Sequence, residues 1–187
     1  MNRISIILIS LLIVSASHAQ SSTDKGNIML NGTISFASKS YGSEGFNTTQ
    51  LGIHPQVGYF LFNNFSAGIL IDYDRTTLDS YHNDKWAAGI ALRYYLDFKQ
   101  VKPFINLGFA YSKTNPTSNL EGNIYGKKWI TAAGVDYFLV SNVAIETILR
   151  YEIEYLSFPG SYNVFYKDTN SHTNTLFVGF GLNFFIY

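Results

Sequence analysis

Three residues of the sequence could form a hydroxyl–imidazole–carboxylate row, which is the arrangement that activates a nucleophile in many hydrolases. They are Thr33, His54 and Asp72, and each lies in a stretch where apolar and polar residues alternate. Neighbouring strands would place the three side chains side by side. The alternative is a satisfied hydrogen-bond chain in the interior of the protein. We favour the alternative, because threonine is a weak nucleophile in such a row, and we predict no catalytic residue.

A second group of residues carries charge on the face that alternation assigns to His54 and Asp72. Counting residues outward from the short turns places Asp136 opposite Glu146. Two facing carboxylates repel each other unless a cation reaches them, and charges in a narrow interior are tolerable only when paired. We expect Arg93 to supply that cation and Arg150 to lie one layer above it. The prediction is a polar network that plugs the interior, formed by His54, Asp72, Arg93, Asn106, Asp136, Glu146 and Arg150.

The same counting gives cross-strand partners for this network. His54 falls opposite Asp72, Arg93 opposite Asn106, and Lys128 opposite Glu154.

No metal or cofactor site is expected. The chain has no cysteine, which excludes disulfides, thiolate metal sites and cysteine nucleophiles. The acidic residues Asp72, Asp74, Asp79 and Asp84 raise the alternative of a calcium site. Scattered acids near a loop usually face solvent, so we expect no metal there.

The elements that must position these residues are β-strands. From Trp86 to Leu96 every second residue is apolar or aromatic, and after a polar break the pattern resumes from Pro103 to Tyr111. A period of two that persists over about ten residues predicts a strand, and two such limbs joined tightly predict a hairpin. About ten residues is also the length that a tilted strand needs to cross a bilayer.

The pattern recurs along the chain and predicts eight strands, at 26–37, 51–61, 65–74, 86–96, 103–112, 128–138, 143–154 and 175–184. The connections alternate in length, and the long ones are 38–50, 75–85, 113–127 and 155–172. Outer-membrane barrels have short periplasmic turns and longer extracellular loops. The predicted fold is therefore all-β, an eight-stranded antiparallel up-and-down transmembrane β-barrel.

Barrel size decides which face is outside. The interior of an eight-stranded barrel is only just wide enough for side chains to fill, so the many large apolar residues must face outward into lipid. A soluble barrel with an apolar lumen is the alternative, but the other face is too weakly charged to be its surface. Aromatic residues mark both ends of the apolar band, as expected at membrane interfaces. They are Tyr59, Phe65, Tyr94, Tyr137 and Phe184 near the short turns, and Phe36, Tyr73, Trp86, Tyr111, Trp129 and Tyr151 near the long connections.

The first 19 residues have the pattern of a secretory signal peptide. Arg3 precedes an apolar run at 4–14, and small residues at Ser17 and Ala19 suit a signal peptidase that cleaves before Gln20. We predict a signal peptide at 1–19 and a barrel domain at 20–187. A membrane anchor is the alternative, but the run is far shorter than the roughly 20 residues that a spanning helix needs. The chain has a formal net charge of zero and only 14% charged residues, so nucleic acid is not an expected partner.

Several short phrases resemble those of the small outer-membrane β-barrel proteins that are similar to OmpX and to the membrane domain of OmpA. They are PQVGYF at 55–60, RYYL at 93–96, KPF at 102–104, GVDYF at 134–138 and GLNF at 181–184. The resemblance covers the whole chain after the leader. The last strand resembles the signal that the barrel assembly machinery reads, although Tyr187 departs from it by falling out of the outward register.

This resemblance implies an integral protein of the bacterial outer membrane, in contact with outer-membrane lipid and lipopolysaccharide. We expect a monomer without enzymatic activity, with a structural or surface-interaction role and a possible external ligand at the four long loops. A small channel for ions or solutes is the alternative. A lipid-modifying enzyme is a third hypothesis, because His172 beside Ser171 and Asn174 is faintly similar to lipid-modifying hydrolases.

Overall fold

The structure, a computed structural model, describes residues 21–41, 46–78, 81–116, 123–157 and 172–187. Eight strands account for nearly all of these residues. They are β1 (Ile28–Tyr41), β2 (Phe46–Phe62), β3 (Phe65–Leu78), β4 (Tyr81–Tyr95), β5 (Val101–Pro116), β6 (Ile124–Val140), β7 (Val143–Ser157) and β8 (His172–Ile186). No helix among these residues is long and apolar enough to span a bilayer.

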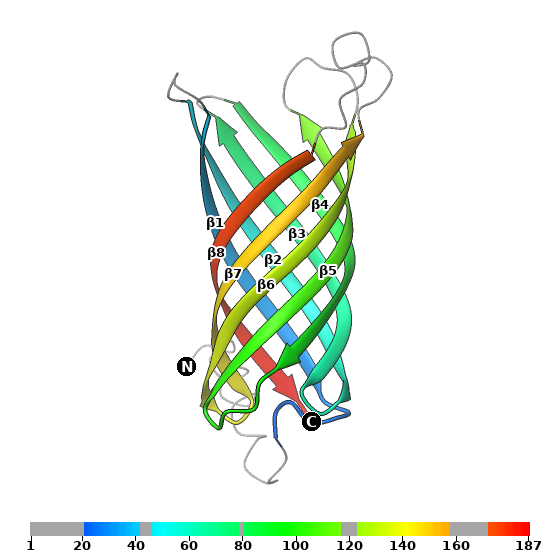
Figure 1. Cartoon of the computed structure of the whole chain (residues 1–187), viewed down its shortest axis with the longest axis vertical. Coiled ribbons are helices and arrows are strands. Elements are labelled where there is room, and N and C mark those ends of the chain that lie inside the picture. Colours follow the sequence, from blue (N-terminus) through cyan, green and yellow to red (C-terminus); the bar gives the residue numbers. More distant parts are fainter. Residues whose placement is uncertain (1–20, 42–45, 79–80, 117–122, 158–171) are drawn as a thin grey trace, which may run out of the picture.

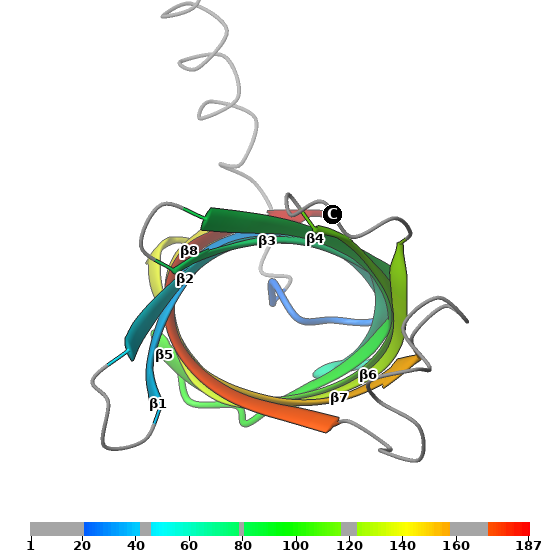
Figure 2. The same cartoon turned by 90° about the horizontal axis from the view of Figure 1, so that it is seen from above.

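Each strand pairs with its neighbours in the sequence, and β8 returns to β1, so the sheet is a closed antiparallel barrel (Figure 1). Seen from above, the strands surround one central lumen (Figure 2). The closing ladder runs from Ile28 opposite Ile186 to Phe36 opposite Val178. Among the described residues this ladder goes no further, although both strands continue toward the long connections. The predicted fold class is confirmed.

The long connections are shorter than the sequence predicted. Strand pairing continues into 38–50, 75–85, 113–127 and 155–172, for example to Tyr41 opposite Phe46 and to Leu78 opposite Tyr81. Apolar residues no longer alternate with polar ones there, because these strand ends project beyond the lipid. Water contacts the outer wall at that height, so its residues do not have to be apolar. Backbone pairing does not depend on that pattern, so the strands extend beyond the apolar band. The middle residues of these connections lie outside the described part of the chain.

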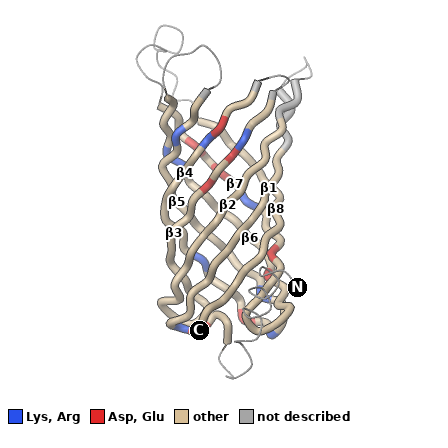
Figure 3. Tube along the Cα trace, turned by 180° about the vertical axis from the view of Figure 1, so that it is seen from behind, with Lys and Arg blue, Asp and Glu red and all other residues tan. Residues whose placement is uncertain are grey.

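Alternation separates the two faces of the wall as predicted. Large apolar side chains such as Ile69, Ile90 and Phe180 point outward and are more than 60% exposed. The lumen receives the buried face, on which polar and charged side chains outnumber apolar ones. Charged residues gather in the half of the barrel next to the long connections, with a smaller group near the short turns (Figure 3).

Residues 21–27 cross the lumen at the end that carries the short turns (Figure 2). Thr23 Oγ1 donates to Asn64 Oδ1 of the first short turn at 2.6 Å, and Ser22 Oγ donates to the carbonyl of Ser141 in the last one. Lys102 Nζ donates to Thr23 Oγ1 at 3.0 Å and to Asp97 Oδ1 at 2.8 Å. We call residues 21–27 the N-terminal strap, since they contact the first and last short turns directly and reach the second through Lys102.

Candidate functional site

The lumen is filled by three stacked layers. The lowest, above the N-terminal strap, is aromatic. Tyr95 and Phe104 have ring centroids 5.6 Å apart, and Phe138 and Phe185 lie 5.1 Å apart. Phe60 lies between these pairs, 6.1 Å from Tyr95 and 6.3 Å from Phe185. All five side chains are buried, so rings occupy the cross-section where a pore would open.

The second layer, which we call the lower ionic layer, is centred on Arg93. Its Nη1 donates to Glu146 Oε2 at 2.7 Å, and its guanidinium lies 4.1 Å from the centroid of Phe104. Asn183 Nδ2 bridges the two carboxylates, at 2.7 Å from Asp136 Oδ2 and 3.1 Å from Glu146 Oε2. The Asn183 amide thus joins two acids that face each other across β6 and β7, and the Arg93 guanidinium pairs with one of them, Glu146.

Hydroxyl groups complete the lower ionic layer. Tyr95 Oη donates to Asp136 Oδ2 at 2.8 Å, and Thr33 Oγ1 donates to Glu146 Oε1 at 2.6 Å. Buried carboxylates need such donors because an unpaired charge in a narrow lumen is costly.

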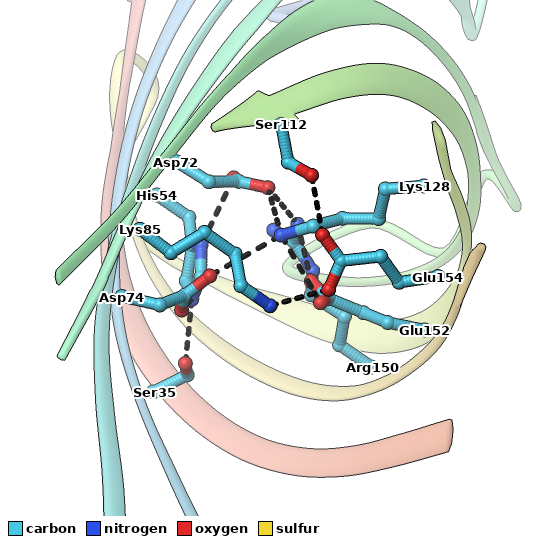
Figure 4. A network of polar contacts seen from close by, with 10 residues as sticks. All are labelled: Ser35, His54, Asp72, Asp74, Lys85, Ser112, Lys128, Arg150, Glu152 and Glu154. Atoms are coloured by element: carbon cyan, nitrogen blue, oxygen red, sulfur yellow. Dashed lines mark hydrogen bonds and ion pairs between the residues drawn. The ribbon is translucent and has the colours of Figure 1, made fainter. Parts of the chain in front are cut away.

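The third layer, the upper ionic layer, spans the lumen from β3 to β6 and β7 (Figure 4). Lys128 Nζ contacts Asp72, Asp74 and Glu152 at 3.1, 3.2 and 3.1 Å. Arg150 Nη2 contacts Asp72 Oδ2 at 2.5 Å and Glu152 Oε1 at 2.7 Å. Lys85 Nζ pairs with Glu154, which also accepts from Ser112 Oγ. Ion pairs between opposite walls cross-link the barrel and close its cross-section.

Two glycines, Gly52 and Gly126, leave room for the side chains of the upper ionic layer. A Cβ at Gly52 would lie 2.4 Å from His54 Nε2 and 2.5 Å from Asp74 Oδ1. A Cβ at Gly126 would lie 2.5 Å from Ser112 Oγ and 2.8 Å from Glu154 Oε1. All four distances are shorter than a Cβ makes with nitrogen or oxygen, so a side chain at either position would displace members of the network.

The predicted hydroxyl–imidazole–carboxylate row exists, but with a different hydroxyl. Thr33 lies opposite His54 in the ladder, yet its hydroxyl donates to Glu146 Oε1 at 2.6 Å. The hydroxyl next to the imidazole is that of Ser35, with Oγ 2.6 Å from His54 Nε2, while His54 Nδ1 lies 2.9 Å from Asp72 Oδ1. The serine is two residues further along β1, on the same face as Thr33.

The surroundings of this row favour a structural role. Asp72 Oδ2 is already engaged by Lys128 and Arg150, and Ser35 is 2% exposed. The cavity beside the row has a volume of about 20 Å³, between the two ionic layers. That volume admits about one water molecule, which is far too little for a substrate. Gln56 Nε2 and Arg150 Nε belong to lining residues and have no hydrogen-bond partner among the described residues.

All seven residues of the predicted plug are buried in the lumen, but they do not form one network. Arg150 belongs to the upper ionic layer and contacts Asp72 and Glu152, not Glu146. Arg150 lies one layer above Arg93, as the sequence predicted, but no contact among the described residues joins the two layers into one network. The seven are His54, Asp72, Arg93, Asn106, Asp136, Glu146 and Arg150.

The structure confirms that the predicted cross-strand partners lie opposite each other in the ladder. Arg93 lies opposite Asn106, and Lys128 opposite Glu154. The Lys128 ammonium, however, reaches Asp72, Asp74 and Glu152 across the lumen. Sequence reasoning missed Asp74 and Glu152 as members of the network. The alternation that places both on the inner face was the available signal.

The alternative of a calcium site does not fit the geometry. Asp72 and Asp74 point into the lumen against Lys128, whereas Asp84 lies on the outer wall with its Oδ1 2.8 Å from Arg75 Nε. Asp79 lies outside the described residues, as does Ser171 of the third hypothesis. No cluster of His, Asp or Glu with metal-binding geometry occurs within the described ranges.

The family model "outer membrane protein beta-barrel domain" matches residues 6–184. The chain belongs to this family. It is an integral protein of the bacterial outer membrane by that membership, and its wall, girdles and closed sheet agree with such a location.

Solved structures of outer-membrane barrels are similar to the chain in fold. Neisserial surface protein A superimposes with a TM-score of 0.60 at 16% identity, covering 86% of this chain and 97% of that one. The N-terminal β-barrel domain of Pseudomonas aeruginosa OprF gives 0.56 at 14%, covering 87% and 98%. Pseudomonas aeruginosa OprG gives 0.54 at 13%, covering 90% and 100%. No curated protein sequence matches the chain.

Proposed function

We propose that this family member is a non-enzymatic barrel with a closed lumen, and that its role is structural or exerted through the surface of its long connections. The observation that carries the proposal is the stack of aromatic, lower ionic and upper ionic layers in one narrow lumen. Each layer fills a different height of the barrel. A solute would have to displace rings and break buried ion pairs in succession.

Single-channel recording in planar bilayers tests this proposal. We expect the purified wild-type protein to give no stepwise current. Arg150→Ala should also be silent, because it disturbs only the upper ionic layer. Combining it with Arg93→Ala, Phe104→Ala and Phe185→Ala removes a member of every layer and should produce a conductance. Regular current steps from the wild type would overturn the proposal.

A small channel is the second candidate, and the cavity of about 20 Å³ between the ionic layers is the observation that favours it. This cavity holds about one water molecule, so a path through it would need both ionic layers to open. The recording that tests the closed barrel decides this candidate too, since a gated path would give current steps in the wild type at some applied voltage.

The mature chain in this proposal begins at Gln20, after removal of residues 1–19. Mass measurement of the protein extracted from the outer membrane tests the cleavage.

The long connections face outside the cell and the short turns face the periplasm. Proteolysis of intact cells at Lys167, in the long connection 155–172, tests that orientation. The barrel assembly machinery is the partner expected at β8, with lipopolysaccharide and lipid around the wall.

A further inference from the structure

The outer wall of the barrel carries very few charges, and their distribution is uneven. Among the described strand residues whose side chains face away from the lumen, the only Lys, Arg, Asp or Glu are Arg75, Asp84, Lys113 and Lys127. Arg75 and Asp84 neutralise each other across β3 and β4, through contacts of 2.8 and 3.1 Å. The remaining net charge of the wall is thus the two lysines.

Lys113 on β5 and Lys127 on β6 are close neighbours. Lys113 lies opposite Tyr125, and Lys127 lies opposite Tyr111, so the two lysines are diagonal partners across one ladder. Diagonal partners on one face of an antiparallel pair lie about 7–8 Å apart, and long lysine side chains span that separation easily. Both lysines are exposed and neither forms an ion pair with another described residue.

The position of the lysines along the barrel is as informative as their charge. Each lies two residues beyond an aromatic of the girdle next to the long connections, Tyr111 for Lys113 and Trp129 for Lys127. Aromatic girdles mark the level of the membrane interface. The ammonium groups therefore lie just outside the hydrocarbon, at the height where lipid head groups begin.

Aromatic residues are the ladder neighbours of the two lysines. Tyr111, Tyr125, Trp129 and Tyr155 are each at least half exposed, and Tyr155 lies opposite Lys127 on β7. Such rings hold the glycerol or sugar part of an amphiphile while its chains lie on the apolar wall below. We define the phosphate patch as Tyr111, Lys113, Tyr125, Lys127, Trp129 and Tyr155.

We propose that the phosphate patch binds the phosphate of a glycolipid in the outer leaflet, held between the ammonium groups of Lys113 and Lys127. Charge complementarity selects a phosphate, because the patch carries two cations and no described acid. The position on the lipid-facing wall selects a phosphate attached to a lipid. The inference rests on the orientation in the proposed function, with the long connections outside.

Binding of lipid A to the purified full-length barrel in nanodiscs tests the inference. Doubly phosphorylated lipid A should bind about thirtyfold more tightly than the same lipid with its phosphates removed, since each lysine near an anionic surface gives about a fivefold gain. Lys113→Ala with Lys127→Ala should abolish this preference. Lys113→Arg with Lys127→Arg should retain it, and added salt should weaken it.

Two exposed lysines at the other end of the barrel provide the matched control. Lys25→Ala with Lys99→Ala changes the net charge equally and should leave the preference for phosphate intact. Equal binding of lipid A by the wild type and by Lys113→Ala with Lys127→Ala would overturn the inference. Equal competition by inorganic phosphate would also overturn it, because the site would then bind free anions. A wrong orientation would give a separate result, namely protection of Lys167 from protease in intact cells.

Discussion

Replacing Arg93 by methionine should strongly destabilise the barrel, because Arg93 is the one described cation in contact with Glu146. Removal of one partner from a buried ion pair costs about 3–5 kcal/mol, and a desolvated cation–aromatic contact like that with Phe104 is worth about 2 kcal/mol. Thr33 and Asn183 still donate to Glu146 after the change, which limits the loss. We therefore expect the free energy of unfolding to fall by about 4 kcal/mol.

The assay is equilibrium unfolding in urea of protein folded into lipid vesicles, followed by tryptophan fluorescence and by mobility on unheated gels. Adding Glu146→Gln to Arg93→Met removes the unpaired charge while the amide still fills the same space. Replacing both partners of a buried pair is often nearly neutral, so the double variant should recover most of the lost stability. Arg75→Met serves as the control, since its pair with Asp84 lies on the exposed outer wall.

Two results would refute this reasoning. The first is a loss from Arg93→Met no larger than that from Arg75→Met, which would mean that the buried pair contributes nothing. The second is a double variant as unstable as Arg93→Met, which would mean that packing of the guanidinium, not its charge, holds the lower ionic layer.

Three further changes have expected outcomes. Gly52→Ala should lower the free energy of unfolding by roughly 1–3 kcal/mol, because the added methyl group overlaps His54 and Asp74. Gly32→Ala is the control and should lower it little, since a Cβ there meets nothing within 4 Å. Thermal melts of both variants measure the difference, and equal losses of stability would contradict the predicted clash. Ser35→Ala should cost about 1 kcal/mol of stability for the lost hydrogen bond and leave the lipids of the outer membrane unchanged by mass spectrometry; a changed lipid A profile that depends on both Ser35 and His54 would instead indicate catalysis. Lys102→Ala should loosen the N-terminal strap, because it removes one of several attachments, and should speed hydrogen exchange at residues 21–27 relative to β1. Unaltered exchange would show that the strap is held without the lysine.

The sequence predicted the strands and the parts of the lumen that short turns control. Asp136 and Glu146 are separated by a short turn, so counting residues gave their pairing correctly. The contact of Lys128 with Asp72 joins β6 to β3 across the lumen, and no count along a hairpin can predict it. That contact depends on how side chains of opposite walls meet once the barrel has closed.

The hydroxyl of the His54 row shows a finer limit. The ladder position of Thr33 was predicted correctly, but hydrogen bonds follow the direction in which side chains lean. His54 reaches toward Ser35, while Thr33 reaches toward Glu146. Alternation identifies which residues share a face, but it does not fix which of two residues on that face an imidazole touches. The aromatic layer was also missed as a unit, because its members come from five different strands and the N-terminal strap lies below them.

The closing ladder between β1 and β8 has a consequence for biogenesis. It joins residues 28–36 to residues 178–186, so it cannot form before β8 is in place. Every intermediate without β8 exposes two unpaired sheet edges. Unsatisfied peptide groups are severely penalised in hydrocarbon, so insertion must wait for, or be helped toward, the arrival of the last strand. A chain that lacks β8 would therefore accumulate in the periplasm, where proteases would degrade it.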